Sequence, residues 1–331
     1  MRLTRETLLR IARETVQKRS LAEPGLVAAY LTGSLLTEDP FLGNATDIDL
    51  VFVHAAEPAV RRELLPLTAE VHLDLRHNPR GEYDKPKQLR VHPWLGPELY
   101  DPLPLYVSQH FFEFVQAGVR DKFHEPANVL ARANRDLENA RQIWSGLQAT
   151  QGSGPERLRD YLRSASRAAN AVALLSGSPL SERRFLLQFP GRAEAAGRPE
   201  LAAGLLGLLG AAQADAGLLA GLLPDWEQGF VAAAGRPGAD VRLDPSRLGY
   251  YKPALQVLLT GDLPQTALWP LLWTWTLAAA ALPPAAQAGW RSACERLGLG
   301  REGFPERLQA LDAFLDGVEE LLESYAATNS L

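Results

Sequence analysis

The chain has 331 residues, of which 46% are hydrophobic and 22% charged, and 34 basic against 39 acidic residues give a net charge of −5. This is an ordinary globular composition, and it excludes disordered and fibrous chains. The acidic balance gives no bulk attraction to nucleic acid or anionic lipid, and neither the part up to Tyr106 nor the remainder is basic. Cys294 is the only cysteine, which excludes an intrachain disulfide and indicates a buried, inert thiol.

Charged residues near the N-terminus and prolines later in the chain argue against membrane insertion. Met1–Gln17 carries Arg and Glu at intervals too short for the apolar stretch of a signal peptide. Leu263–Trp290 contains no charged residue, but four prolines interrupt it. We therefore expect a buried core helix in that stretch and a cytoplasmic protein that has no membrane partner.

The first third of the chain alternates between helical and strand patterns. Apolar residues three and four apart predict an opening helix over Thr4–Arg19. Runs of strand length or with period-two alternation predict strands at Leu26–Thr32, Asp47–Val53 and Val71–Arg76. Between the last two, Pro58–Glu70 carries a proline near its start and leucines on one face, which predicts a helix.

The rest of the chain changes from loops to helices. His77–Tyr106 is rich in prolines, which predicts loops with short strands at Gln88–His92 and Glu98–Tyr100. The helices predicted beyond Pro104 are Val107–Val119, Pro126–Leu147, Pro155–Leu175, Leu201–Leu223, Leu255–Leu259, Thr266–Leu282, Pro284–Leu297 and a last helix that begins at Pro305. We therefore expect an α+β protein, with a mixed sheet and helices in residues 1–125 and an all-α domain in residues 126–331.

Polar residues coincide at three of the predicted strands. Gly33-Ser34 closes the first strand, and Asp47 and Asp49 open the second. Side chains at i and i+2 of a strand share a face about 6.5–7 Å apart, so these two carboxylates project side by side. Because neighbouring carboxylates repel, we expect positive charge between them, for which two Mg²⁺ ions about 3.5–4 Å apart fit. Asp74 can join them from the third strand, and Gly33 with Ser34 permits close approach of a phosphate.

These residues carry a family resemblance. Leu31-Thr-Gly-Ser34, followed after twelve residues by Asp47-Ile-Asp-Leu50, resembles the signature of the nucleotidyltransferase superfamily typified by DNA polymerase beta, and Asp74 matches its third carboxylate. Gly96-Pro-Glu-Leu-Tyr-Asp-Pro102 resembles a late strand of the small bacterial members. The match covers about residues 5 to 105. The helical remainder resembles, in arrangement only, the domain that holds the acceptor in aminoglycoside nucleotidyltransferases.

The resemblance implies a mechanism and a role for each residue. An acceptor hydroxyl would attack the α-phosphorus of ATP or another nucleoside triphosphate, and pyrophosphate would leave, with two Mg²⁺ ions as cofactors. By the family's pattern Asp47 and Asp49 would bind both ions. Asp74 would bind the catalytic ion, and Gly33 with Ser34 would hold the β and γ phosphates.

Arg76 and Lys252 are further candidates for contacts with the nucleotide. Arg76 flanks Asp74 together with His72 and His77. These side chains either contact phosphate or orient the carboxylate, or they form an ordinary solvated strand face. Lys252 follows two tyrosines that could stack on a base. The alternative interpretation is the start of an amphipathic helix whose lysine reaches the surface.

The main hypothesis is an enzyme that moves AMP from ATP, or the monophosphate of another nucleoside triphosphate, onto a hydroxyl of a small acceptor. Relatives that modify antibiotics often use a separate glutamate as general base, for which Glu70 and Glu82 are the neighbours in sequence. A macromolecular acceptor is the second hypothesis, and the acidic charge counts against nucleic acid. The third is a catalytically silent nucleotide-binding or partner-binding protein that keeps the fold.

Overall fold

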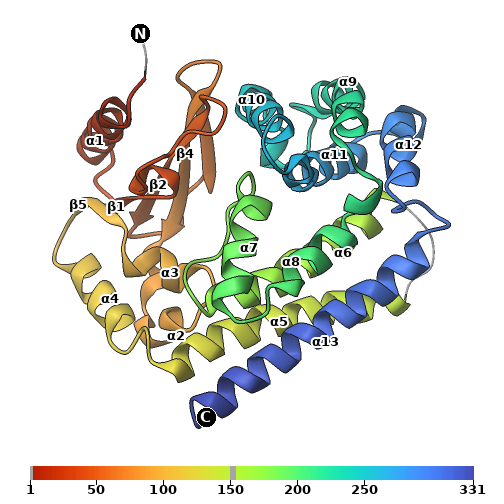
Figure 1. Ribbon diagram of the computed structural model, residues 1–331. Coiled ribbons are helices and arrows are strands. Elements are labelled where there is room, and N and C mark those ends of the chain that lie inside the picture. Colours follow the sequence, from red (N-terminus) through yellow and green to blue (C-terminus); the bar gives the residue numbers. More distant parts are fainter. Residues whose placement is uncertain (1–2, 150–153) are drawn as a thin grey trace. The chain divides into compact units, whose positions relative to one another are not determined.

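The computed structural model describes residues 3–149 and 154–331, and the chain divides into two compact units, Met1–Glu125 and Pro126–Leu331 (Figure 1). The fold is mixed α+β: the first unit holds one five-stranded sheet with helices, and the described part of the second unit is helical. The polymerase beta-like arrangement stays a prediction.

The first unit is organised around a mixed sheet of strand order β3-β4-β2-β1-β5. Strands β2 and β4 pair in parallel, and the other neighbours pair antiparallel. The elements are α1 (Arg5–Ala22), β1 (Leu26–Thr32), the 3₁₀ turn η1 (Ser34–Leu36), β2 (Thr46–His54), β3 (Arg62–Pro66), β4 (Val71–Pro79), α2 (Pro86–Arg90), α3 (Leu95–Tyr100), β5 (Leu103–Val107) and α4 (Phe111–Arg120). The predicted opening helix and the three predicted strands are confirmed, within three residues at each end.

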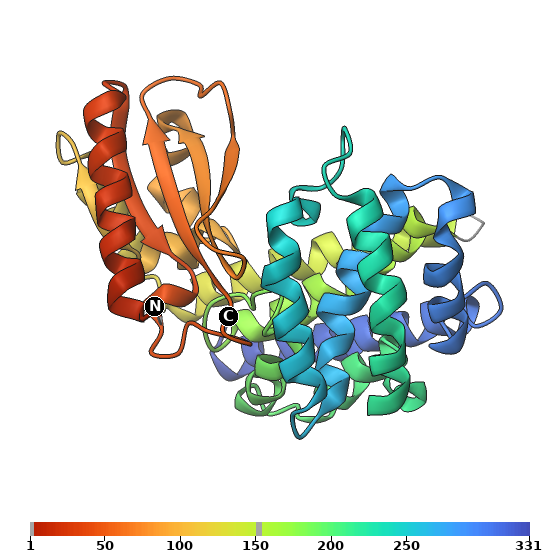
Figure 2. The same ribbon diagram turned by 90° about the horizontal axis from the view of Figure 1, so that it is seen from above.

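The two faces of this sheet are covered by different helices. Helix α1 lies along one face (Figure 2), where its Leu8 and Val16 join a core with Ile48 and Leu50 of β2. On the opposite face, residues around Tyr30 pack with side chains from α2, α3 and α4. Because side chains alternate along a strand, the polar residues between the buried ones of β2 project from this second face.

The helix predicted over Pro58–Glu70 is wrong, because strand β3 occupies this segment. Strand β3 forms a hairpin with β4, in which Leu64 pairs with Asp74. The Thr68 hydroxyl accepts hydrogen bonds from the backbone N–H groups of Glu70 and Val71, which closes the turn. The spacing of the leucines fits either structure, and the edge position tolerates Pro66, which lacks an N–H.

The short strands predicted at Gln88–His92 and Glu98–Tyr100, and the late strand at Gly96–Pro102, are also wrong. These residues lie in or beside helices α2 and α3, and the late strand is β5. Pro86 occupies the first turn of α2, where a missing N–H costs no hydrogen bond. The helix expected from Val107 begins only at Phe111, because Val107 ends β5.

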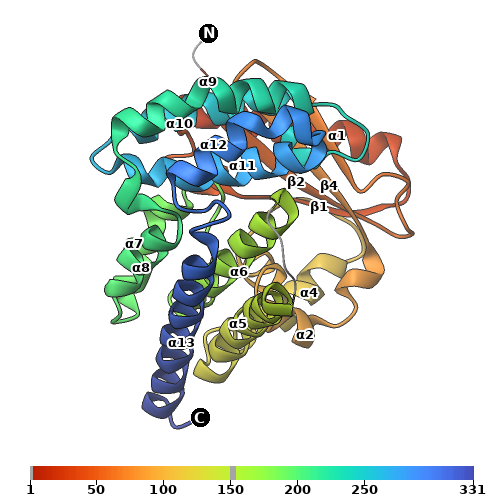
Figure 3. The ribbon, with the colours of Figure 1, turned by 90° about the vertical axis from the view of Figure 1, so that its right-hand side faces the viewer.

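The second unit contains long helices that pack on one another, with α13 alongside α5 (Figures 1 and 3). Its α-helices are α5 (Pro126–Ala149), α6 (Pro155–Leu174), α7 (Phe185–Ala195), α8 (Glu200–Leu208), α9 (Ala216–Ala233), α10 (Leu248–Leu259), α11 (Leu268–Ala281), α12 (Ala288–Arg296) and α13 (Phe304–Thr328).

Two helix predictions in the second unit need correction. The single helix expected over Leu201–Leu223 is two helices, α8 and α9. Between them Gly210 has a φ of 80°, and a side chain there would lie 2.2 Å from the carbonyl oxygen of Leu297. Asp215 then caps α9 by accepting from the N–H of Leu218. The helix predicted at Leu255–Leu259 is only the end of α10, which begins at Leu248. Helix α7 was not predicted.

Two expectations about apolar residues can be compared with the structure. The uncharged stretch supplies α11, most of whose residues are buried. Among the described residues, no helix combines the length and the apolar character that a membrane span requires. Cys294 is buried as predicted, and burial raises the pKa of its thiol.

Two histidines of the first unit, His54 and His77, lie between the carboxylates of Glu23 and Glu63. His54 Nε2 is 2.9 Å from His77 Nδ1, and His77 Nε2 is 2.9 Å from a carboxylate oxygen of Glu63. Burial holds the pKa of both histidines below the usual 6.5, and for His54 the neighbouring ring adds to this effect. The folded state therefore favours the neutral imidazoles.

This arrangement predicts a loss of stability in mild acid. Because the folded pKa values lie below the unfolded ones, the stabilisation is present above about pH 6.5 and is lost as the pH falls. Urea unfolding between pH 7.5 and 5.5 measures the effect. We expect the decline in unfolding free energy to be shallower in His54→Gln/His77→Gln, and equal slopes in the variant and the wild type would contradict the assignment.

Candidate functional site

The candidate site lies on the parallel strands β2 and β4. In their register Asp47 pairs with His72, and Asp49 pairs with Asp74. Residues two apart in a strand share a face, and paired residues of neighbouring strands face the same side of a sheet. All four side chains therefore project from the face opposite α1.

Three of these side chains form a compact buried cluster. One ligand atom each of Asp47, His72 and Asp74 lies within 4.8 Å of the others. Their exposed fractions are 7%, 1% and 2%. Neighbouring ligand atoms of one ion, each about 2.1 Å from it, lie about 3.0–3.5 Å apart, so the three atoms would have to approach by up to about 1.5 Å to hold one divalent ion. The residues present therefore fit a metal.

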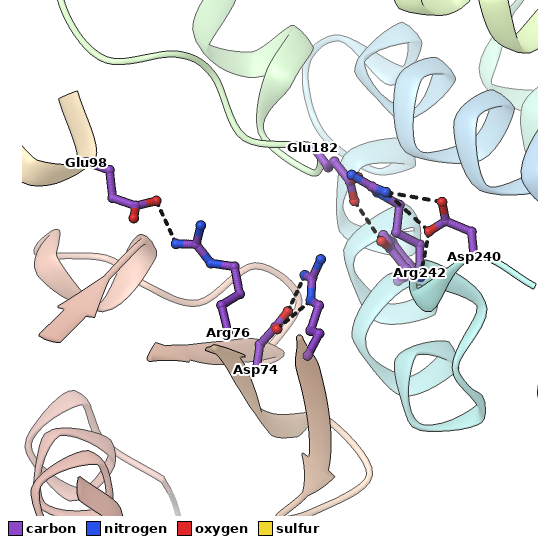
Figure 4. Close-up of polar contacts among 8 residues, drawn as sticks. Asp74, Arg76, Glu98, Glu182, Asp240 and Arg242 are labelled. Atoms are coloured by element: carbon purple, nitrogen blue, oxygen red, sulfur yellow. Dashed lines mark hydrogen bonds and ion pairs between the residues drawn. The ribbon is translucent and has the colours of Figure 1, made fainter. Parts of the chain in front are cut away.

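Arg62 of β3 already compensates the charge of Asp74. Its Nε donates to one carboxylate oxygen at 2.7 Å and its Nη2 to the other at 2.6 Å. Figure 4 shows this bidentate contact on Asp74. Such bidentate pairs are among the stronger ion pairs in proteins, and here the carboxylate is buried. The pair satisfies a charge that burial would otherwise make costly.

The turn after β1 is built around a close approach of Asp49. Gly33 has a φ of 79°, and a Cβ at this position would lie 2.0 Å from Asp49 Oδ2. Ser34 begins the turn η1, and its hydroxyl lies 3.2 Å from that of Thr46, the first residue of β2. Any side chain at position 33 would displace the Asp49 carboxylate.

Arg76 is held on the same face by a partly buried polar network. Its Nη2 lies 2.6 Å from a carboxylate oxygen of Glu98 in α3, a pair labelled in Figure 4. The other oxygen of Glu98 accepts from the Tyr30 hydroxyl at 2.8 Å. Although burial opposes ionisation, Glu98, Tyr30 and Asp49 together hold the pKa of Arg76 above its ordinary value.

Lys252 lies in the second unit, on α10. Its ammonium is 2.7 Å from a carboxylate oxygen of Glu227 on α9. Of the tyrosines before it, Tyr250 is buried with the Arg183 guanidinium 3.4 Å from its ring centroid. Tyr251 is fully buried, and neither ring is open to stack on a base. The assignment of Lys252 to a nucleotide site stays a prediction.

The second unit contains another network of ion pairs, centred on Glu182, which precedes α7. The carboxylate of Glu182 accepts from Arg242 and from the hydroxyl of Tyr251, the latter at 2.7 Å. Arg242 also pairs with Asp240 (Figure 4). Although burial opposes ionisation, these donors hold the pKa of Glu182 below its ordinary value. Every charge in this group has an opposite charge or a donor beside it, which is the pattern of a structural network.

The structure brings together only part of the predicted site. Asp47 and Asp74 share the cluster, and its third member is His72. Asp49 shares their face but lies against Gly33. The period-two alternation that places Asp74 on this face applies equally to His72, so the sequence did carry a signal for it.

Other parts of the site had no sequence signal. Arg62 falls in the segment that the sequence predicts to be a helix, and Glu98 falls in a predicted short strand, so neither is predicted to face the site. Of the two glutamates considered as a base, both are exposed, and Glu82 pairs with Arg61 at 2.9 Å. The assignment of Glu70 or Glu82 as general base stays a prediction.

Comparisons with known proteins add no identification. No family model matches the chain, and a search of curated proteins found no match.

The close approach at Gly33 predicts a position-specific effect of an added methyl group. Gly33→Ala should lower the free energy of unfolding by more than about 1 kcal/mol, because it combines a left-handed φ with displacement of Asp49. Gly25→Ala is the matched control, since nothing lies within 4 Å of the added Cβ. Urea unfolding measures both variants, and equal stabilities would show that the Asp49 contact is not a constraint.

Proposed function

We propose that the protein is a metal-dependent nucleotidyltransferase that moves a nucleoside monophosphate, AMP from ATP, onto a hydroxyl of a small acceptor and releases pyrophosphate. One observation carries the proposal. The β2–β4 register pairs Asp74 with Asp49, which lies next to the turn at Gly33, and Asp47 lies in one cluster with Asp74. Carboxylates that converge beside a glycine turn suit a metal-bound triphosphate.

The residues of the site would bind either the metal ions or the phosphates, according to their position and charge. Asp47 and Asp74 would hold the first ion, and Asp49 would bind the second, for which Mg²⁺ is the family's usual choice. When bound, such ions polarise the transferred phosphate and stabilise the attacking and leaving oxygens. Gly33 and Ser34 would hold the phosphates beside Asp49, and Arg76 would add positive charge nearby.

The proposed acceptor is a small molecule. The net charge of −5 offers no bulk attraction to a polyanion, so RNA is disfavoured. The resemblance of the helical part to the acceptor-binding domain of aminoglycoside nucleotidyltransferases supports a hydroxyl-bearing compound of that size, an argument from architecture alone.

A second candidate function has a specific observation in its favour. Arg62 already occupies both oxygens of Asp74. A guanidinium in that place satisfies the carboxylate without a metal, as expected of a silent nucleotide-binding or partner-binding protein that keeps the fold. The two candidates differ in whether pyrophosphate is released.

Pyrophosphate release tests the proposal directly. We expect release from one of ATP, GTP, CTP and UTP with a divalent ion over a panel of hydroxyl acceptors. Asp47→Asn should reduce the rate roughly 100-fold or more, because it removes a charge that holds the ion. Asp84→Asn, an exposed carboxylate outside the cluster, is the matched control. A thermal unfolding curve for each variant separates loss of activity from loss of fold.

Two results would contradict the proposal. If no combination of nucleotide and acceptor releases pyrophosphate, the silent candidate is favoured. Release that persists unchanged in Asp47→Asn would place the chemistry elsewhere in the protein.

A further inference from the structure

We propose that the imidazole of His72 binds the metal directly, and that the cluster therefore selects a first-row transition ion such as Mn²⁺ over Mg²⁺. The inference deepens the proposed function, because it concerns the metal of the same site. It can be tested by metal binding alone, whether or not the protein transfers a nucleotide.

The backbone fixes where the imidazole points. Val71 and Leu73, the neighbours of His72 on β4, are buried in the core beneath α1. Alternation along the strand then sends His72 to the face of Asp74, where the register places it opposite Asp47. Its exposed fraction is 1%, and one of its ring nitrogens lies within 4.8 Å of both carboxylate oxygens.

The donor set favours a transition ion over Mg²⁺. Mg²⁺ prefers oxygen ligands in an octahedral arrangement and keeps several waters, whereas imidazole nitrogen suits Fe²⁺, Ni²⁺, Cu²⁺ and Zn²⁺. Mn²⁺ binds most weakly of this series and serves here as its paramagnetic probe. Two carboxylates and one imidazole also leave coordination positions open, as at catalytic metal centres with three protein ligands.

Arg62 opposes this ion without blocking it. Its two hydrogen bonds use one lone pair on each oxygen of Asp74, and every carboxylate oxygen has a second. A divalent cation at the cluster would nevertheless be repelled by the guanidinium beside it. Removing that charge in Arg62→Gln should therefore strengthen Mn²⁺ binding, by about 10-fold.

Electron paramagnetic resonance of the full chain, prepared without a histidine tag, tests the proposal with Mn²⁺ as the probe. Loss of the free-ion signal gives the affinity, and spin-echo modulation from ¹⁴N reports a bound imidazole. We expect one tight Mn²⁺ with ¹⁴N modulation in the wild type, displaced only by a large excess of Mg²⁺.

Variants assign that nitrogen to a residue. His72→Gln should lose the modulation and weaken Mn²⁺ binding at least about 10-fold, while Mg²⁺ binding changes little. His110→Gln is the matched control, because that side chain is 94% exposed. If His72→Gln fails to fold in a thermal scan, His72→Asn replaces it, and the wild-type modulation remains a readout.

The outcomes separate this inference from the proposed function. Bound Mn²⁺ without ¹⁴N modulation, unchanged affinity in His72→Gln, or no Mn²⁺ binding by the wild type would each overturn the inference. Modulation without pyrophosphate release would support the inference and leave the transfer reaction without support. Pyrophosphate release together with an unchanged Mn²⁺ affinity in His72→Gln would support transfer and argue against a nitrogen ligand.

Discussion

The parallel pairing of β2 with β4 is the constraint on which the candidate site depends. Asp47 meets His72, and Asp49 meets Asp74, only in this register. A shift of one residue would turn the carboxylates towards α1 and the apolar residues between them towards the polar site. The apolar residues beneath α1, among them Ile48, therefore specify the register. The hydrophobic core on one face thus places the polar residues on the other.

Two charged side chains of this face, Asp74 and Arg76, have an opposite charge beside them. Asp74 is compensated by Arg62 from β3, and Arg76 by Glu98 from α3. Each partner comes from an element next to the site rather than from the same strand. Because a buried, unpaired charge is costly, these neighbours hold the side chains in fixed positions, as a binding site requires. An added cation or anion would meet charges that are already partly satisfied.

The sequence predicted the frame of the site better than its charge partners. Strands β1, β2 and β4 have clear periodicity, and alternation alone places the carboxylates on one face. Arg62 could not be found in this way, because the spacing of its neighbouring leucines fits a helix as well as a strand. Only pairing with β4 decides between the two, and this contact between strands leaves no local pattern. The same holds for Glu98, whose role depends on how α3 packs against the sheet.

The position of Arg62 explains how a buried site with two carboxylates can exist before any ligand arrives. Arg62 and Asp74 lie on the two strands of one hairpin, so their pairing needs neither β2 nor a bound ion. Asp47 then adds the second carboxylate from β2 when the sheet closes. The guanidinium leaves the pair of carboxylates with one net negative charge instead of two, which lowers the repulsion between them. The hairpin therefore supplies in advance part of the positive charge that a metal would otherwise have to provide.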